Sequence, residues 1–302
     1  SDYQAQRRGG MGKSATAVKD EDFVEHLLIA STHTTILCFT NAGKVYWLKV
    51  YQIPVAGRNS RGRPVINLLP LEDGERINSI LPVEQYRDDH FVIMATANGT
   101  VKKTALSQYS NPRKVGLRAV DLVDGDHLVG TAVVDNGNDV MLFSSEGKAV
   151  RFAGSDVRAM GRVSKGVRGM RLSTEHRVIS MVIPAVNGYL LTVCDNGYGK
   201  RTSTVEFPTK GRGGKGMIAI QASDRNGPLV GATQLFDGDE IMLISDQGTM
   251  VRTRGDEVSV VGRNTQGVRI IRLKENENLV SLARIAEPDE IEEGEGDDLS
   301  DG

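Results

Sequence analysis

Five Gly-centred turns punctuate the 302-residue chain at steps of 56, 48, 50 and 51 residues. Each turn has a polar residue beside the glycine and lies between two short apolar runs, a pattern typical of a β-hairpin. A period of about 50 residues indicates similar units stacked in a propeller or an array. The repeat therefore predicts one domain, although the length alone suggests two. The turn glycines are Gly43, Gly99, Gly147, Gly197 and Gly248.

A second glycine recurs about half a unit away from the first. An apolar strand follows it, and a polar turn then leads to a fourth strand, as in residues 229–232. Four strands per unit is the make-up of a propeller blade, so we expect an all-β fold. Six units carry this glycine, which predicts six blades of four antiparallel strands over residues 1–286. The second glycines are Gly12, Gly62, Gly116, Gly166, Gly216 and Gly267.

The two glycine series differ in number, because the first unit, residues 1–29, has no opening hairpin. That hairpin either lies upstream of Ser1 or is replaced by the C-terminal strand, and the sequence leaves both possibilities open. The first blade is therefore expected to be incomplete at the N-terminus or to be completed by the other end of the chain. Because the chain begins inside a repeat, we expect it to be a piece of a longer protein.

The charge is distributed unevenly along the chain. Residues 287–302 contain nine acids and neither Lys nor Arg, whereas the rest carries 37 basic against 30 acidic side chains, a net charge of +7. A basic body with an acidic tail indicates a polyanionic partner with which the tail competes. We expect residues 287–302 to be a disordered tail, and a purely solubilising role is the alternative.

The loop before each second glycine is basic in all six units. Equivalent positions in a ring lie on one rim, so these cations form a curved positive band that matches the phosphates of duplex DNA. Glycine lets backbone N–H groups approach a phosphate closely. The residues expected to bind DNA are Gln6, Arg7, Arg8, Gly9, Gly10, Met11, Gly12, Lys13, Arg58, Arg61, Arg63, Arg113, Lys114, Arg118, Arg162, Lys165, Arg168, Lys210, Arg212, Lys215, Arg263 and Arg269.

The residues favour no enzyme. A phosphate-binding loop ending at Gly12 and Lys13 would need glycine where Arg7 stands, and the Gly-rich segment 211–216 precedes a strand pattern instead of a helix. The five histidines are scattered without metal-ligand spacing. We therefore expect no catalytic residue, no metal and no cofactor in this chain.

Other features place the protein in a broad class. No run approaches 18 apolar residues, so we expect no membrane contact. Cys38 and Cys194 each lie in an apolar run, which predicts buried free thiols in a cytoplasmic protein. The aromatic content of 5% is low for a platform that stacks single-stranded bases, and Trp47 is expected in the core.

Residues 6–12, Gln-Arg-Arg-Gly-Gly-Met-Gly, resemble the Gln-Arg-Arg-Gly-Gly-Lys-Gly box of the C-terminal domain of DNA gyrase A subunits. The likeness extends over nearly the whole chain, through segments 97–104, 122–126, 157–161 and 261–268. It implies a six-bladed β-pinwheel that wraps duplex DNA. The family's catalytic tyrosine lies upstream, so this chain is expected to bind DNA without cutting it.

The resemblance also implies partners. They are duplex DNA, the remainder of the A subunit, and the B subunit in a heterotetramer that introduces negative supercoils with ATP and magnesium. It implies a bacterial cytoplasmic, nucleoid-associated location, and we expect the isolated domain to be monomeric. Two alternatives remain open, namely the related C-terminal domain of topoisomerase IV, which lacks an intact box, and a propeller that binds an acidic protein.

One position departs from the family's box, because Met11 replaces its lysine. Residues 212–216, Arg-Gly-Gly-Lys-Gly, match the last five residues of the usual box. We hypothesise that this second box-like loop, with Arg212 and Lys215, offsets the cation missing at Met11.

Overall fold

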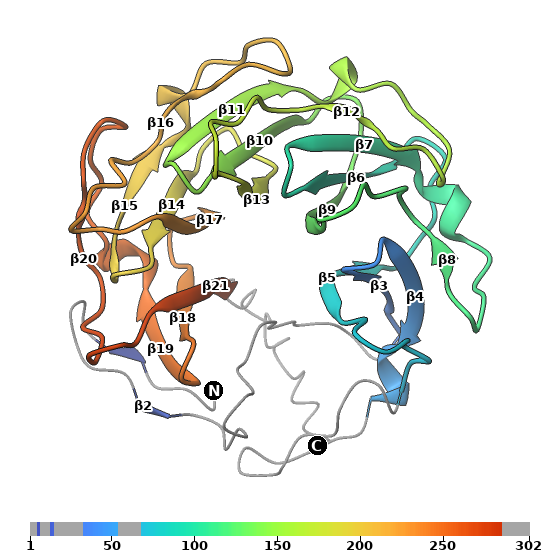
Figure 1. Ribbon diagram of the computed structural model, residues 1–302, viewed down its shortest axis with the longest axis horizontal. Helices are drawn as coiled ribbons and strands as arrows, with labels where there is room; N and C mark the ends of the chain where they lie inside the picture. Colours follow the sequence, from blue (N-terminus) through green and yellow to red (C-terminus); the bar gives the residue numbers. More distant parts are fainter. Residues whose placement is uncertain (1–4, 7–12, 15–32, 54–67, 286–302) are drawn as a thin grey trace, which may run out of the picture.

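Five β-sheets stand around a common centre in the computed structural model, which describes residues 5–6, 13–14, 33–53 and 68–285 (Figure 1). The described chain consists of β-strands and single turns of 3-10 helix, so the predicted all-β class is confirmed. No helix in these ranges is long and apolar enough to cross a membrane.

Each sheet is a propeller blade with an inner strand, two hairpin strands and a short outer strand. The inner strands are β5 (Ile77–Val83), β9 (Leu128–Val134), β13 (Val178–Val182), β17 (Leu229–Leu235) and β21 (Leu279–Ile285). The first hairpin strands are β3 (Thr35–Thr40), β6 (Phe91–Thr96), β10 (Asp139–Ser144), β14 (Tyr189–Cys194) and β18 (Glu240–Ser245). The second hairpin strands are β4 (Lys44–Lys49), β7 (Thr100–Ala105), β11 (Lys148–Ala153), β15 (Tyr198–Ser203) and β19 (Thr249–Arg254). The outer strands are β8 (Leu117–Arg118), β12 (Val167–Arg168), β16 (Met217–Ile218), β20 (Val268–Arg269) and β2 (Lys13–Ser14).

The prediction of six blades is wrong, because the described residues form five. The reason is that a sequence unit is not a blade. The outer strand that follows the second glycine of one unit pairs with the hairpin of the preceding unit, as β8 of the third unit pairs with β4. The five described outer strands thus join the five described hairpins, which gives four blades of four strands and a last blade to which β1 (Ala5–Gln6) adds a fifth.

The first unit contributes its outer strand to the last blade. β2 pairs antiparallel with β19, with Lys13 opposite Met250, and β1 (Ala5–Gln6) runs parallel to β19, with Ala5 beside Arg252. Within the described residues, strands from the beginning and the end of the chain thus share one sheet. The described strands of the N-terminal unit thus belong to the fifth blade, and no separate first blade lies within the described residues.

The core lies between neighbouring blades, and the hairpin strands are buried on both faces. Along β10, Val140 and Leu142 pack into the cluster shared with the blade before, while Met141 and Phe143 pack into the cluster shared with the blade after. All four side chains are fully buried. Strands covered on both faces have continuous apolar runs, which explains why the sequence lacks strict polar–apolar alternation there.

Both cysteines are buried free thiols, as expected from their apolar surroundings. Burial raises the pKa of Cys38 and of Cys194 to about 12. Neither side chain is therefore a thiolate at neutral pH, and both act as small apolar core residues. Trp47 packs against the cluster between the first two described blades.

A polar contact repeats between successive blades. After each second hairpin strand the chain forms a 3-10 turn, and the described turns are η1 (Val50–Gln52), η3 (Leu106–Tyr109), η4 (Gly154–Asp156), η5 (Thr204–Glu206) and η6 (Gly255–Glu257). A side chain four residues after the hairpin glycine donates a hydrogen bond to a backbone carbonyl in or beside the next blade's turn. Four such inter-blade donors are described, namely Trp47 to Tyr109, Lys103 to Gly154, Arg151 to Thr204 and Phe207, and Arg201 to Val258, at 2.7 to 3.1 Å.

Candidate nucleic-acid interface

The basic loops lead into the outer strands, which lie along the periphery of the ring (Figure 1). Most of the predicted cations in the described loops are exposed, namely Arg113, Lys114, Arg118, Lys165, Arg168, Lys210, Arg212, Lys215 and Arg269, whereas Arg162 and Arg263 are half-buried. Gln6 and Lys13 lie in β1 and β2 of the last blade. Arg7, Arg8, Gly9, Gly10, Met11, Gly12, Arg58, Arg61 and Arg63 lie outside the described residues.

The second glycine allows each loop to cross close over the hairpin of the preceding unit. Gly166 has φ of +96°, and a Cβ atom there would lie 2.5 Å from the carbonyl oxygen of Val101. Gly267 has φ of +72°, and its Cβ would lie 2.3 Å from the carbonyl oxygen of Gly199. Only glycine combines this backbone conformation with so close an approach. The glycine therefore fixes how the basic loop is seated.

The two glycine series of the sequence meet in space. The carbonyl of Gly99 accepts hydrogen bonds from the N–H groups of Gly169 and Met170, at 2.7 and 3.1 Å. The same pair of bonds recurs at three other hairpins, where Gly43 accepts from Ala119 and Val120, Gly147 from Ala219 and Ile220, and Gly197 from Ile270 and Ile271. Each of these four hairpin turns thus anchors the segment that follows the next unit's outer strand.

Consecutive basic loops are hydrogen-bonded in a row. Arg212 Nη1 donates to the carbonyl of Arg168 at 2.6 Å, and the N–H of Gly213 donates to the carbonyl of Gly169 at 2.9 Å. The next loop repeats the contact, because Arg263 Nη1 donates to the carbonyl of Ile218 at 3.0 Å. The loops of the fifth and sixth units therefore rest on the outer-strand segments of the units before them, and within the described residues these basic loops form a hydrogen-bonded band. One or two of the five guanidinium donors are used, which leaves others for a ligand.

Near the end of the band, two arginines flank one tyrosine. The guanidinium groups of Arg225 and Arg269 lie 4.3 and 5.3 Å from the centre of the Tyr198 ring, and Arg269 Nη2 donates to Tyr198 Oη at 2.7 Å. Arg225 and Arg269 also line a surface pocket of about 580 Å³ with Arg272 and Lys274. Sequence reasoning missed Arg225, although it follows Asp224 in a polar turn opposite the hairpin that contains Asn196.

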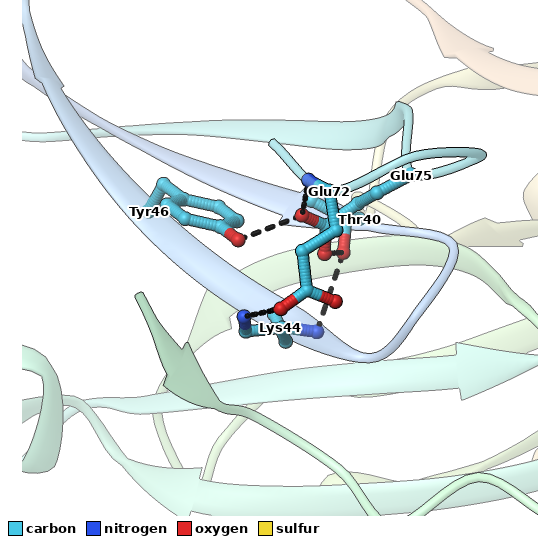
Figure 2. A network of polar contacts seen from close by, with 5 residues as sticks. All are labelled: Thr40, Lys44, Tyr46, Glu72 and Glu75. Carbon is cyan, nitrogen blue, oxygen red and sulfur yellow. Dashed lines mark hydrogen bonds and ion pairs between the residues drawn. The ribbon is translucent and has the colours of Figure 1, made fainter. Parts of the chain in front are cut away.

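One cation at the edge of the first described blade is neutralised within the blade. Lys44, which pairs across the ladder with Arg118, forms an ion pair with Glu72 at 3.3 Å (Figure 2). Glu75 accepts hydrogen bonds from Tyr46 Oη at 2.7 Å and from Thr40 Oγ1 at 2.9 Å. Both carboxylates tie the hairpin to its own blade, and Glu72 also neutralises a cation near the outer strand.

Two buried lysines lie beneath the band, and the sequence interpretation did not single them out. Lys102 and Lys200 are 1% and 0% exposed, and burial lowers the pKa of each to about 8. In the sequence each lysine stands three residues after a hairpin glycine and beside a second cation, Lys103 or Arg201, so nothing there marks it as buried. Lysine is rarely buried completely without a dedicated partner.

Acidic side chains in the polar turns accept hydrogen bonds from backbone N–H groups. Asp126 Oδ1 accepts hydrogen bonds from the N–H groups of Asn98 and His127, at 3.0 and 2.8 Å. Asp239 Oδ2 accepts one from the N–H of Phe236 at 2.8 Å. Within the described ranges no group of three or more His, Cys, Asp and Glu side chains is arranged to hold a metal ion.

A family model and the sequence relatives of this chain indicate the same protein family. The model of the family "DNA gyrase C-terminal domain, beta-propeller" matches residues 1–31, 34–84, 90–135, 138–184, 188–234 and 239–286. The DNA gyrase A subunit from Salmonella typhimurium is 57% identical over 293 residues, and the one from Escherichia coli K12 is 54% identical over 306 residues. These alignments cover 97% and 99% of this chain but 33% and 35% of the relatives. The chain thus spans about a third of their length.

Solved structures show the same architecture. A DNA gyrase A C-terminal domain superposes with a TM-score of 0.84 at 28% identity, covering 94% of this chain and 93% of that domain. A C-terminal domain of DNA topoisomerase IV superposes with a TM-score of 0.77 at 24% identity, covering 89% of this chain and 84% of the other. The second likeness concerns the fold alone.

Proposed function

Because the chain belongs to the DNA gyrase C-terminal domain family of β-propellers, we propose that it binds duplex DNA along its basic outer rim and bends the duplex around that rim. The observation that carries this proposal is the hydrogen-bonded row of basic loops, in which Arg212 rests on Arg168 and Arg263 rests on Ile218. A continuous cationic band fits a continuous line of phosphates, which is the polyanion that Lys and Arg neutralise with release of counterions.

Bending the duplex requires several contacts at once. Turning about 45 base pairs through half a circle costs on the order of 10 kcal/mol, given a persistence length near 150 base pairs. One loop cannot offset this cost, but a row of loops can do so without contacts to bases, as in other proteins that depend on backbone contacts and DNA deformability. The proposed binding is therefore independent of sequence.

The relatives supply the wider setting of the proposal. They are DNA gyrase A subunits, and this chain corresponds to about a third of their length. We place the domain in a bacterial cytoplasmic heterotetramer of A and B subunits, where it presents the bent duplex for negative supercoiling driven by ATP that the B subunit hydrolyses. The domain itself needs no cofactor in this scheme. The topoisomerase IV alternative is not favoured, because the close sequence relatives are gyrase subunits.

Salt-dependent binding of a duplex of about 45 base pairs, labelled at both ends for energy transfer, tests the proposal. We expect affinity to fall with salt at a log–log slope of about −0.9 for each phosphate contacted. We also expect the energy transfer to rise when the protein binds. The test variant is Arg168→Ala, which removes an exposed rim cation. Its control is Arg87→Ala, which removes an exposed arginine outside the basic loops. A slope near zero, or binding without a change in energy transfer, contradicts binding by wrapping.

A further inference from the structure

Two lysines occupy the same position in different blades and have the same unusual surroundings. Lys102 in β7 and Lys200 in β15 each follow the hairpin glycine by three residues, and both are buried. No acidic side chain lies within ion-pair distance of either ammonium group among the described residues. A buried charge is costly unless it is paired or hydrogen-bonded, so the partners of these ammonium groups indicate what they do.

The partners of Lys200 are carbonyl groups of one basic loop. Its Nζ donates to the carbonyls of Gly262, Arg263 and Thr265 at 2.6, 2.5 and 3.2 Å, and it lies 3.0 Å from the hydroxyl of Thr265. The ammonium group thus gathers three peptide oxygens of the sixth unit's loop on its inner side.

Lys102 makes one equivalent contact and one of its own two blades away. Its Nζ donates to the carbonyl of Arg162 in the fourth unit's basic loop and to the carbonyl of Ala119, at 2.5 Å, behind the third unit's outer strand. The ammonium group therefore joins two neighbouring segments of the band.

These contacts orient the peptide planes of the loops. In a trans peptide the C=O and N–H bonds point in opposite directions, so a carbonyl held inward leaves the next residue's N–H facing outward. The N–H groups of Val163 and Asn264 follow the inward carbonyls of Arg162 and Arg263. The described structure records no hydrogen bond for either N–H. Outward N–H groups beside arginine side chains are a common arrangement for binding phosphate oxygens.

Of the five described hairpins, those of Gly99 and Gly197 carry a lysine at this position. At the same position β4 has Tyr46 and β11 has Val150. Tyr46 packs its ring against Gly116, yet its hydroxyl donates to Glu75 instead of to a loop carbonyl (Figure 2). The inward hold on a loop is therefore not a requirement of the blade fold, since neighbouring blades form without it.

We propose that Lys102 and Lys200 are positioning residues of the DNA interface, which hold loop carbonyls inward so that the N–H groups of Val163 and Asn264 bind phosphate oxygens of the duplex. This inference rests on the proposed function, because it assumes that the rim binds DNA. It adds a backbone component to a surface that the sequence described by its side-chain cations alone.

The first test replaces each lysine in the 302-residue chain by methionine, which keeps the length and removes the donors. We expect Lys102→Met and Lys200→Met each to weaken duplex binding about threefold to tenfold, the size of one or two lost hydrogen bonds. The slope of affinity against salt stays unchanged, because a buried ammonium group neutralises no phosphate directly. Tyr46→Phe, which loses one hydrogen bond at the matched position, leaves DNA affinity unchanged.

Two results of this test overturn the inference. One is unchanged affinity in both methionine variants. The other is a salt slope that flattens by about 0.9 per lysine, which makes the ammonium group itself a phosphate contact. If the unmodified protein does not bind duplex DNA, the proposed function itself is contradicted. Failure of the inference and failure of the proposed function are therefore distinguishable.

A second measurement needs no variant and holds if the methionine chains do not fold. In amide ¹⁵N–¹H spectra of the unmodified protein, we expect the resonances of Val163 and Asn264 to shift when a 45-base-pair duplex is added, about the length of the proposed wrap. The N–H of Gly169, which already donates to Gly99 at 2.7 Å, is the internal control. Unshifted resonances of Val163 and Asn264 in a protein that binds the duplex contradict the inference.

Discussion

Ala5 lies beside Arg252 in a parallel pairing that repeats two isolated bridges elsewhere in the ring, Ala159 with Lys103 and Val260 with Arg201. In all three pairs the first residue precedes a second glycine by seven positions, and the second follows a hairpin glycine by four. The N-terminal segment is therefore seated on the last blade as an ordinary unit is seated on the blade before it.

This pairing predicts that the two ends can be cross-linked. Ser14 stands directly opposite Thr249 in the antiparallel ladder, a relationship within reach of a disulfide. We expect Ser14→Cys with Thr249→Cys to form an intrachain disulfide on mild oxidation, seen by non-reducing electrophoresis and peptide mass spectrometry. Ser14→Cys with Thr100→Cys, the equivalent position in β7, forms none. A link in the control pair, or none in the first, contradicts the closure.

The inter-blade donors predict a stability change. Arg151 donates to the carbonyls of Thr204 and Phe207 and forms an ion pair with Asp139 at 2.8 Å, with both side chains about four-fifths buried. Arg151→Met leaves these acceptors unpaired, so we expect the free energy of unfolding to fall by about 1–3 kcal/mol. Urea denaturation measures it. Arg254→Met, which breaks an exposed ion pair, should leave the midpoint unchanged, and equal effects of the two substitutions would refute the assignment.

The close packing of the basic loop on the hairpin predicts that two glycines of this loop differ in how much an alanine substitution destabilises the protein. Gly166→Ala forces a Cβ to within 2.5 Å of the Val101 carbonyl at a positive φ, and we expect a loss of about 1–3 kcal/mol. Gly161→Ala in the same loop meets no atom within 4 Å and should be neutral or slightly stabilising. Thermal unfolding of both variants checks the contrast, and a neutral Gly166→Ala contradicts the close crossing.

The buried lysines predict a particular pH dependence of stability. Burial lowers the pKa of Lys102 and of Lys200 from 10.5 to about 8. Around Lys102, the charge of Arg162 lowers the pKa further and that of Asp121 raises it. Around Lys200, the charge of Glu206 raises the pKa and that of Arg263 lowers it. Between pH 8 and 10.5 the unfolded chain therefore binds more protons than the folded chain, and this contribution makes stability rise with pH.

The comparison with a double variant isolates the lysine contribution. Relative to Lys102→Met with Lys200→Met, the unfolding free energy of the unmodified protein should rise by up to about 1.4 kcal/mol per pH unit per lysine in that window. Urea midpoints at about pH 7.5 and 9.5, on either side of the lowered pKa, measure it. Tyrosines and cysteines titrate in both proteins and cancel. Parallel pH profiles contradict the lowered pKa values.

The second box-like loop predicts a local effect on DNA. Arg212 and Lys215 are exposed, and Arg212 also donates to Arg168. We expect Arg212→Ala with Lys215→Ala to reduce bending of the duplex and to flatten the salt slope by about 0.9 for each phosphate that the loop no longer neutralises. Energy transfer on an end-labelled duplex checks it. Unchanged bending and affinity would remove the idea that this loop offsets Met11.

Much of the fold followed from the glycines. The hairpins and the described outer strands lie where the sequence placed them, because glycine and short apolar runs act locally. The number of blades did not follow from the number of units. Which hairpin an outer strand joins depends on pairing across units, as β8 with β4 or β2 with β19, and no residue in a two-residue strand encodes that partner.

The exposed cations of the candidate site could be predicted from the sequence. Cations before a periodic glycine, such as Lys165 and Lys215, identified the rim because charge and register are visible in the sequence. Lys102 and Lys200 were missed, since their partners are backbone carbonyls about 60 residues away and carbonyls have no sequence signal. Arg225 was missed for a similar reason, because it meets Tyr198 only after the blade folds.

The sharing of a sheet by β2 and β19 has a consequence for how the chain is made. Synthesis at about 5–20 residues per second adds the residues between Ser14 and Thr249 over about 10–50 s, and during this time β2 has no partner strand. Earlier blades need only the next unit to be complete, so they can form as the chain emerges. Among the described strand pairings, those of β1 and β2 with β19 have the largest separation in sequence, which makes them the slowest to find and the last to form on the ribosome.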